Sequence, residues 1–174
     1  MLTGNHIHLR PWKRGDEDDL VKHANNQNIA SYLTDAFPHP YTLQDAVSFL
    51  DKVFDQRPIQ VFAIGYQQEA IGAIGVFPQA GIHRKSAEIG YWLSELYWGR
   101  GFVSESISLM VPYAFATWDL NRLFARPFYN NPGSKKALEK SGFHLEAILQ
   151  KSIIKNNKVL DECIYSLIKP AFLP

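Results

Sequence analysis

Residues 87–116 have the pattern of a strand, a glycine-containing loop and a helix, and this unit constrains the fold most. Residues 87–93, Ala-Glu-Ile-Gly-Tyr-Trp-Leu, are apolar and aromatic enough for a buried strand. From Val103 onward, apolar residues recur at helical spacing. The first N–H groups of a helix lack internal partners, and Gly99 and Gly101 let a ligand approach the backbone closely. The unit therefore predicts an anion-binding site, with an ordinary strand-to-helix connection as the alternative.

Two common phosphate-binding motifs are excluded. No stretch matches the pattern G-x-x-x-x-G-K-[ST] of a Walker loop. The dinucleotide pattern G-x-G-x-x-G is broken, because Ser104 stands where the third glycine is required. The acetyl-CoA motif of the GNAT N-acetyltransferases, [RQ]-x-x-G-x-[GA], falls on residues 98–103. Gly101 matches that motif, whereas Trp98 and Val103 depart from its other two fixed positions.

Further motifs along nearly the whole chain resemble the RimJ/RimL-like branch of the GNAT superfamily, the ribosomal-protein N-acetyltransferases. Residues 87–93 resemble the strand before the acetyl-CoA loop. Asn-Pro-Gly-Ser at 131–134 and Leu-Glu-Lys-Ser-Gly-Phe at 138–143 resemble the segment N-x-x-S … L-E-K-x-G-F. Residues 8–12 and 37–42 are also similar to that branch, and the motifs occur in the family's order.

The resemblance implies a single GNAT domain over residues 1–174, of mixed α/β class. Its twisted, mostly antiparallel sheet would have about seven strands, splay between strands four and five, and be flanked by helices. The residue pattern agrees with this order. It predicts strands at 7–10, 59–64, 71–77, 87–93, 123–128, 148–154 and 159–168. It predicts helices that begin at 16 and at 103, helices at 44–54 and 134–140, and a loop at 29–41. Pro112 predicts a kink in the central helix rather than its end.

Composition fits a cytoplasmic protein. Eighteen Lys and Arg against 17 Asp and Glu leave a formal charge of +1, with no basic surplus for nonspecific nucleic-acid binding. No apolar run is long enough to span a membrane, and the first residues lack the apolar core of a signal peptide. The single cysteine, Cys163, excludes an internal disulfide and is expected to be buried in a strand.

The resemblance implies an acetyl-CoA-dependent N-acetyltransferase that moves an acetyl group to a primary amine by direct transfer in a ternary complex, without a metal. Its partners would be acetyl-CoA and an amine acceptor such as a protein N-terminus, and a homodimer is compatible with it. Because Trp98 and Val103 depart from the motif, a catalytically silent CoA-binding or protein-interaction module with the same fold is the alternative.

The family's cofactor contacts can be carried over residue by residue. A backbone N–H near Leu93 would meet the thioester carbonyl, and the loop before the central helix would hold the pyrophosphate. For Asn131, a plain helix cap before Pro132 is the alternative. The full set is Trp92, Leu93, Ser94, Trp98, Gly99, Arg100, Gly101, Phe102, Val103, Ser104, Asn131 and Ser134.

Two residues are the candidates for proton transfer. Glu88 lies on the strand that leads into the site, at a family position that is often acidic, and could accept the proton of the amine. A solvated or salt-bridged glutamate is the alternative. Many GNAT enzymes protonate the thiolate with a tyrosine seven residues after the motif asparagine. Leu138 stands there, as is common in the RimJ/RimL-like branch, and Ser134 is the branch's candidate donor. Weaker candidate bases are His83, Asp35 and His39.

The acceptor is expected to meet Asp35, Phe37, His39 and Tyr41, on the loop where GNAT enzymes usually build one wall of the acceptor site. Aromatic and proline residues hold such a loop in shape at a modest entropic cost. Asp45 is the only other carboxylate near Asp35 in sequence, too few for a polyamine site. We therefore predict a peptide N-terminus or a small primary amine ahead of spermidine or an aminoglycoside.

Overall fold

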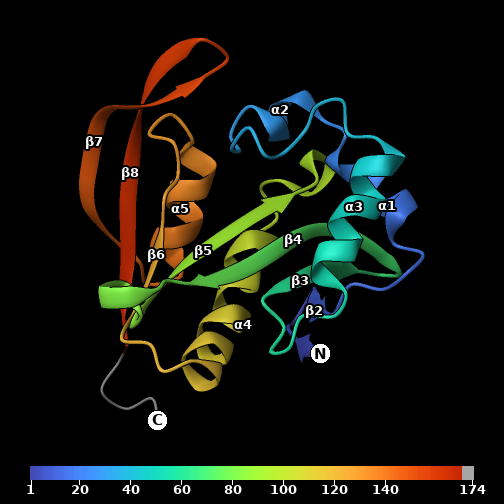
Figure 1. The fold of residues 1–174 in the computed structure, drawn as a ribbon, viewed down its shortest axis with the longest axis horizontal. Helices are drawn as coiled ribbons and strands as arrows, with labels where there is room; N and C mark the ends of the chain where they lie inside the picture. Colours follow the sequence, from blue (N-terminus) through green and yellow to red (C-terminus); the bar gives the residue numbers. More distant parts are fainter. Residues whose placement is uncertain (170–174) are drawn as a thin grey trace.

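The computed structural model describes residues 1–169, which form one eight-stranded sheet in the order β1-β2-β3-β4-β5-β6-β8-β7 (Figure 1). All neighbouring strands are antiparallel except β5 and β6. The two-residue β1 accounts for the difference from the expected number of about seven. The strands are β1 (Leu2–Thr3), β2 (His8–Arg10), β3 (Val61–Tyr66), β4 (Glu69–Pro78), β5 (Ser86–Leu93), β6 (Arg122–Ala125), β7 (His144–Lys155) and β8 (Lys158–Ile168).

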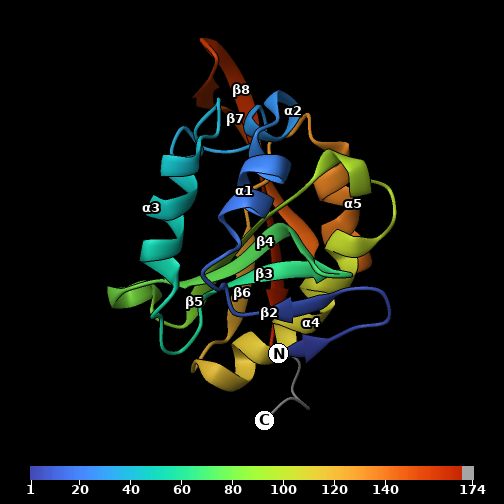
Figure 2. The same cartoon turned by 90° about the vertical axis from the view of Figure 1, so that its right-hand side faces the viewer.

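Helices cover both faces of the sheet (Figure 2). Side chains of α1 and α3 pack on one face, and those of α4 and α5 pack on the other. None of the helices in residues 1–169 is long and apolar enough to cross a membrane. The helices are α1 (Glu17–Ala24), α2 (Gln27–Ala30), α3 (Leu43–Val53), α4 (Phe102–Thr117) and α5 (Pro132–Lys140), with 3₁₀ turns η1 (Gly81–His83) and η2 (Glu95–Tyr97).

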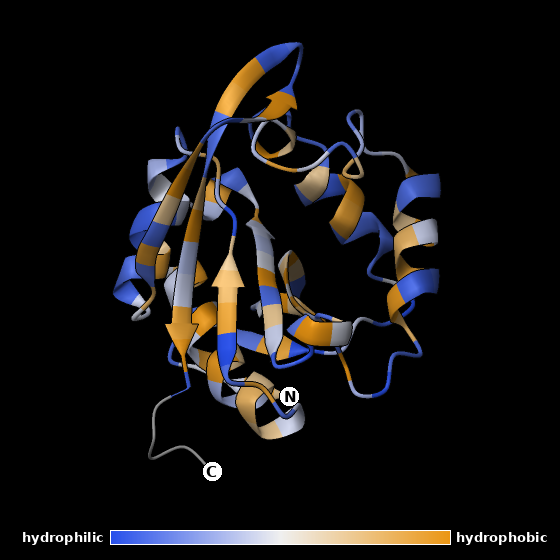
Figure 3. Cartoon of the chain, turned by 60° about the vertical axis from the view of Figure 1, so that its left-hand side comes forward, coloured by the Kyte–Doolittle hydropathy of each residue, from blue (hydrophilic) through white to orange (hydrophobic). Residues whose placement is uncertain are grey.

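Alternation along the strands divides the interior into two hydrophobic cores. On β3, Phe62 and Ile64 join the core under α4 and α5, whereas Val61 and Ala63 join the core under α1 and α3. This is the two-residue period of a strand whose faces are both covered. Figure 3 shows hydrophobic and hydrophilic segments alternating along both the strands and the helices.

The sheet opens between β5 and β6. The parallel pairing covers only Ser86–Glu88 of β5, opposite Arg122–Phe124 of β6. β5 then continues to Leu93 with β4 as its partner on one side only. Figure 1 shows β5 leaning away from β6 and β8 beyond this point. This is the predicted splay between strands four and five, when β1 is not counted, and it leaves backbone groups of β5 available to a ligand.

Local sequence signals set several boundaries as predicted. Thr42 and Asp45 form a capping box at the start of α3, in which Asp45 N–H donates to Thr42 Oγ1 at 3.3 Å. Gly142, with φ +85°, follows the end of α5. The β7–β8 hairpin turns on Asn156 and Asn157, whose φ angles of 50° and 59° suit a two-residue turn. Cys163 is buried, also as predicted.

Two details differ from the sequence predictions. Ile29 and Ala30, expected in a loop, belong to α2. The strand expected over 123–128 ends at Ala125, two residues before Pro127, which has no N–H to donate to a ladder. The helix α4 continues through Pro112, as predicted. The single-domain prediction extends over residues 170–174, which lie outside the described part.

Candidate active site

The loop before α4 has the geometry of an anion cradle. Gly99 and Gly101 have φ angles of 76° and 83°, in the left-handed region that favours glycine, and a Cβ on either would point into open space. Gly101 is the N-cap of α4, whose first helical bond joins Glu105 N–H to the Gly101 carbonyl at 3.0 Å. The N–H groups of residues 102–104 precede that bond and therefore have no partner within the helix. The loop therefore presents unpaired backbone donors of the kind that bind anions.

Aromatic packing holds this loop in place. Phe102 is 5% exposed, and its ring lies 5.1 Å from that of Tyr66 and 6.1 Å from that of Tyr97. The guanidinium of Arg100 lies 5.2 Å from the Tyr97 ring centre, which leaves its charge at the exposed rim of the loop. Glu105, in the first turn, accepts a bond from His6 N–H at 2.8 Å. The helix N-terminus is thus fixed from several sides before any ligand arrives.

The end of β5 presents one backbone donor to the splay. Ser94 N–H donates to the Ile71 carbonyl at 2.8 Å, so the N–H and C=O of Leu93 point away from β4 and into the opening. The Leu93 carbonyl accepts from Trp98 Nε1 at 2.8 Å. The N–H of Leu93 therefore remains available where the sequence predicted a donor to the thioester carbonyl. Trp98, a departure from the family motif, has a structural role here.

Ser94 connects β5 to a buried histidine that sequence reasoning missed. His23 of α1 is 2% exposed, with Nδ1 3.0 Å from Ser94 Oγ and Nε2 2.8 Å from Glu69 Oε2. The hydroxyl and the N–H of Ser94 are therefore both bonded inside the protein. His23 lies 71 residues from Ser94 and 46 residues from Glu69 along the chain, so no local pattern in the sequence signals this network.

Asn131, Ser134 and Tyr91 meet at the N-terminus of α5. Asn131 Oδ1 accepts from Ser134 N–H at 3.1 Å, which is the helix-cap role, and its side-chain NH₂ stays able to donate to a ligand. The Tyr91 hydroxyl lies 2.8 Å from Ser134 Oγ. Burial raises the pKa of Tyr91, with the bond to Ser134 opposing, so the phenol stays protonated. Leu138, at the position of the family's tyrosine, is fully buried in the core. Tyr91 was missed from sequence because its contact with Ser134 spans 43 residues.

Glu88 points to the same face of the sheet as Trp92, by strand alternation. Burial raises the pKa of the Glu88 carboxyl group; the positive charge of Arg126 opposes this shift and the charge of Glu162 adds to it. A raised pKa makes Glu88 a better proton acceptor near neutral pH. Four residues of strand separate it from Trp92 by roughly 13 Å, at about 3.3 Å per residue. Glu88 would therefore reach an amine at the end of β5 through water.

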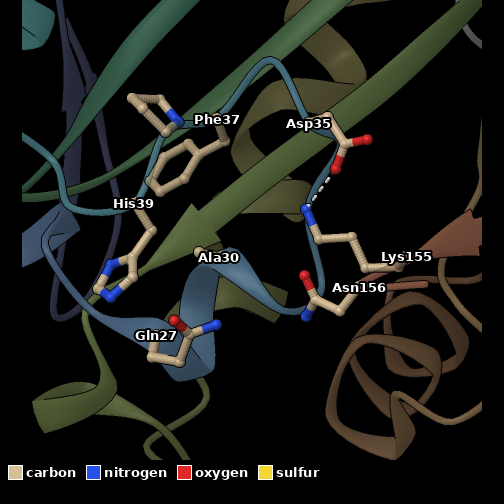
Figure 4. Close-up of a pocket in the computed structure, with 8 residues that line it drawn as sticks. Gln27, Ala30, Asp35, Phe37, His39, Lys155 and Asn156 are labelled. Carbon is tan, nitrogen blue, oxygen red and sulfur yellow. Dashed lines mark hydrogen bonds and ion pairs between the residues drawn. The ribbon is translucent and has the colours of Figure 1, made fainter. Parts of the chain in front are cut away.

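A cavity of about 240 Å³ lies between the loop after α2 and the tip of the β7–β8 hairpin (Figure 4). Three of the predicted acceptor residues line it: Asp35, Phe37 and His39. The Phe37 ring lies 5.8 Å from that of Trp92, which connects the cavity to β5. Pro38, on the loop that was predicted to form one wall, also lines it. The other four lining residues were not predicted from sequence: Gln27, Ala30, Lys155 and Asn156.

Tyr41 and His83 do not reach this cavity. Tyr41 is 5% exposed and packs behind Phe37, with ring centres 5.3 Å apart. Its burial raises its pKa to about 12. His83 lies in η1, which precedes β5, whereas the cavity and the glycine loop lie beyond the end of that strand. Among residues 1–169, no group of three or more His, Cys, Asp or Glu side chains could hold a metal ion.

Comparisons with known proteins agree with this geometry. A model of the GNAT acetyltransferase domain matches residues 6–144. The uncharacterized N-acetyltransferase YoaA of Bacillus subtilis is 37% identical to this chain over 156 residues. The alignment covers 82% of this chain and 86% of YoaA. The ribosomal-protein-serine acetyltransferase of Escherichia coli is 30% identical over 109 residues, in an alignment that covers 63% of this chain and 60% of that enzyme.

A solved structure of the ribosomal-protein acetyltransferase RimL with coenzyme A has the same fold. Its TM-score is 0.79 at 21% identity, over 95% of each chain. The predicted mixed α/β fold and the resemblance to the RimJ/RimL-like branch are confirmed.

Proposed function

The chain belongs to the GNAT family of acetyl-CoA-dependent N-acetyltransferases, and we propose that its acceptor is a primary amine on a peptide N-terminus or a small molecule. One observation carries the proposal. The cavity lined by Asp35 and Phe37 adjoins Trp92 at the end of β5, where Leu93 offers a free N–H to the thioester. An amine in that cavity would face the acetyl group across the sheet.

Direct transfer in a ternary complex accounts for the arrangement. Acetyl-CoA supplies an activated thioester, so the protein needs only to position two substrates and stabilise charge. The N–H groups at the start of α4 would hold the pyrophosphate, and the Leu93 N–H would donate to the carbonyl oxygen as negative charge develops there. Trp92, at the end of the same strand, would align the cofactor arm.

Glu88 is the proposed general base. A free α-amine has a pKa of about 8, so much of it is protonated at neutral pH and must lose a proton before attack. The carboxylate shares a sheet face with Trp92 and has a raised pKa. The proton would pass through water, because the spacing along β5 is too long for direct contact.

Ser134 is the proposed hydrogen-bond donor to the departing thiolate. The partly buried Tyr91 phenol can donate to Ser134 Oγ, which leaves the serine hydroxyl hydrogen free to point at the sulfur. A hydrogen bond to a charged group contributes about 1.5–3 kcal/mol, which suits assistance to a leaving group. Tyr91 would act by orienting Ser134.

The charges around the cavity favour a peptide N-terminus or a small amine over a polyamine. Asp35 is the only carboxylate among the described residues that line the cavity, and it is already paired with Lys155. Asp45 is engaged in the capping box of α3, and its bonds to Thr42 lower its pKa. A polycation would therefore find little uncompensated negative charge here.

Thiol release from acetyl-CoA tests the proposal against the silent-module alternative. The purified protein is incubated with acetyl-CoA and a panel of N-terminal peptides, small amines and polyamines, and free thiol is followed over time. Steady turnover with a peptide or small amine supports the proposal. Calorimetric binding of CoA with no turnover across the panel would favour a silent CoA-binding module, which the departures at Trp98 and Val103 keep as the rival.

A further inference from the structure

A buried lysine lies on the wall of the cavity. Lys155 ends β7 at the hairpin tip, and its side chain is only 10% exposed. Its ammonium lies 2.9 Å from Asp35 Oδ1, on a loop 120 residues away in sequence (Figure 4). Asp35 itself is 85% exposed. The cation is therefore fixed within the protein, while its counter-ion is on a solvated side chain.

This asymmetry makes the carboxylate the exchangeable partner. Asp35 is solvated when it is unpaired, so the carboxylate itself loses little when it leaves. A buried ammonium without a partner is far more costly. When Asp35 moves away, another anion must take its place. The position that Asp35 occupies is therefore suited to the carboxylate of a ligand.

The other lining residues agree with a ligand of mixed character. Gln27 and Asn156 bring neutral amides, which bond to either sign of charge, and Phe37 brings an apolar surface. His39 is a further potential donor. No second carboxylate of the described residues faces the cavity, so Lys155 has no other counter-ion along its walls.

We propose that Lys155 forms an anion subsite, and that the natural acceptor carries a carboxylate close to its amine. This inference rests on the proposed function of the cavity as the acceptor site. The carboxylate of the acceptor displaces Asp35 from Lys155. Asp35, once released, is free to pair with the ammonium of the same acceptor before it loses its proton. One ion pair within the protein is thus replaced by two ion pairs with a zwitterionic ligand, and no charge is left without a partner.

Binding of matched acceptors tests this exchange. The affinities of Gly-Glu-Phe-amide and Gly-Gln-Phe-amide are compared by calorimetry in the presence of CoA, which prevents turnover. The two peptides share the same α-amine, so their ratio isolates the carboxylate. We expect roughly 10- to 100-fold tighter binding of the acidic peptide, the range of a charged hydrogen bond. A second pair, Gly-Phe and Gly-Phe-amide, shows whether a terminal carboxylate serves instead of an acidic side chain.

Three variants assign the effect. Lys155→Gln should bring the ratio close to one, whereas Lys158→Gln, an exposed lysine across the same turn, should leave it unchanged. Asp35→Asn removes the competing carboxylate from an exposed position and should raise the ratio. This rise is read with the N-acetylated forms of the two peptides, which lack the ammonium that a released Asp35 would contact in the acidic peptide alone.

Equal affinity within both peptide pairs would overturn the proposal, as would a preference that survives Lys155→Gln. The ion pair would then only hold the hairpin tip to the loop. Because the readout is binding, a failure of acetyl transfer in the thiol assay would contradict the proposed function without affecting this result.

Discussion

Replacing Gly101 by valine tests the cofactor loop most sharply. At φ +83° a β-branched residue is strained, at a cost of about 1–2 kcal/mol per residue for L-amino acids in this region. For a chain of 174 residues this lowers Tm by roughly 2–8 °C. The new side chain would also stand in the open space that the pyrophosphate needs. Loss of even one charged hydrogen bond, about 1.5–3 kcal/mol, weakens binding of CoA roughly 10- to 100-fold.

Gly81→Val is the matched control, because Gly81 also has a positive φ, +62°, with open space around its missing Cβ. Gly81 precedes β5, whereas Gly101 follows it, so the control shares the strain and not the site. Both variants are compared by thermal unfolding and by calorimetric titration with CoA. Similar losses of Tm with a loss of affinity only in Gly101→Val are expected. Wild-type affinity in a folded Gly101→Val variant would show that the loop is misassigned.

Four further substitutions separate catalysis from stability. Glu88→Gln should lower kcat and change its pH dependence; an unchanged pH–rate profile would assign the base elsewhere. Because the folded-state pKa of Glu88 is raised, its ionisation favours unfolding above the unfolded value near 4.3, so Glu88→Gln should have an equal or higher Tm at pH 7. Tyr91→Phe should lower kcat about tenfold and leave the KM for acetyl-CoA unchanged. In a Ser134→Ala background it should cause no further loss of kcat, whereas additive losses would mean that the two hydroxyls act independently. Asp16→Ala removes the carboxylate that the Arg10 guanidinium contacts at 2.7 and 2.8 Å. It should lower the free energy of unfolding, measured in urea, by about 3 kcal/mol and leave kcat unchanged. Unchanged stability would mean that the pair contributes little.

Sequence signals with a short range predicted much of the fold. The capping box of Thr42 and Asp45, the cap at Asn131 and the turn at Asn156 each act within three residues, so their patterns can be read directly. The strand that ends at Ala125 was predicted too long, because its apolar pattern continues past the point where Pro127 interrupts hydrogen bonding.

Contacts across long sequence separations were not predictable. Lys155 has the sequence context of an ordinary exposed lysine at a hairpin tip, and only the fold brings it to Asp35. The approach of Tyr91 to Ser134 depends on the splay between β5 and β6, which places α5 opposite the end of β5. Half of the cavity and the partner of the candidate acid therefore appear only in three dimensions.

Product analysis by mass spectrometry tests the central claim most directly. The protein is incubated with acetyl-CoA and a mixture of N-terminal peptides, small primary amines and polyamines, and the acetylated products are identified. We predict a single acetyl group on the amine of a peptide N-terminus or a small amine, with polyamines left largely unmodified. Acetylated polyamines with peptides and small amines untouched would contradict the account of the acceptor site.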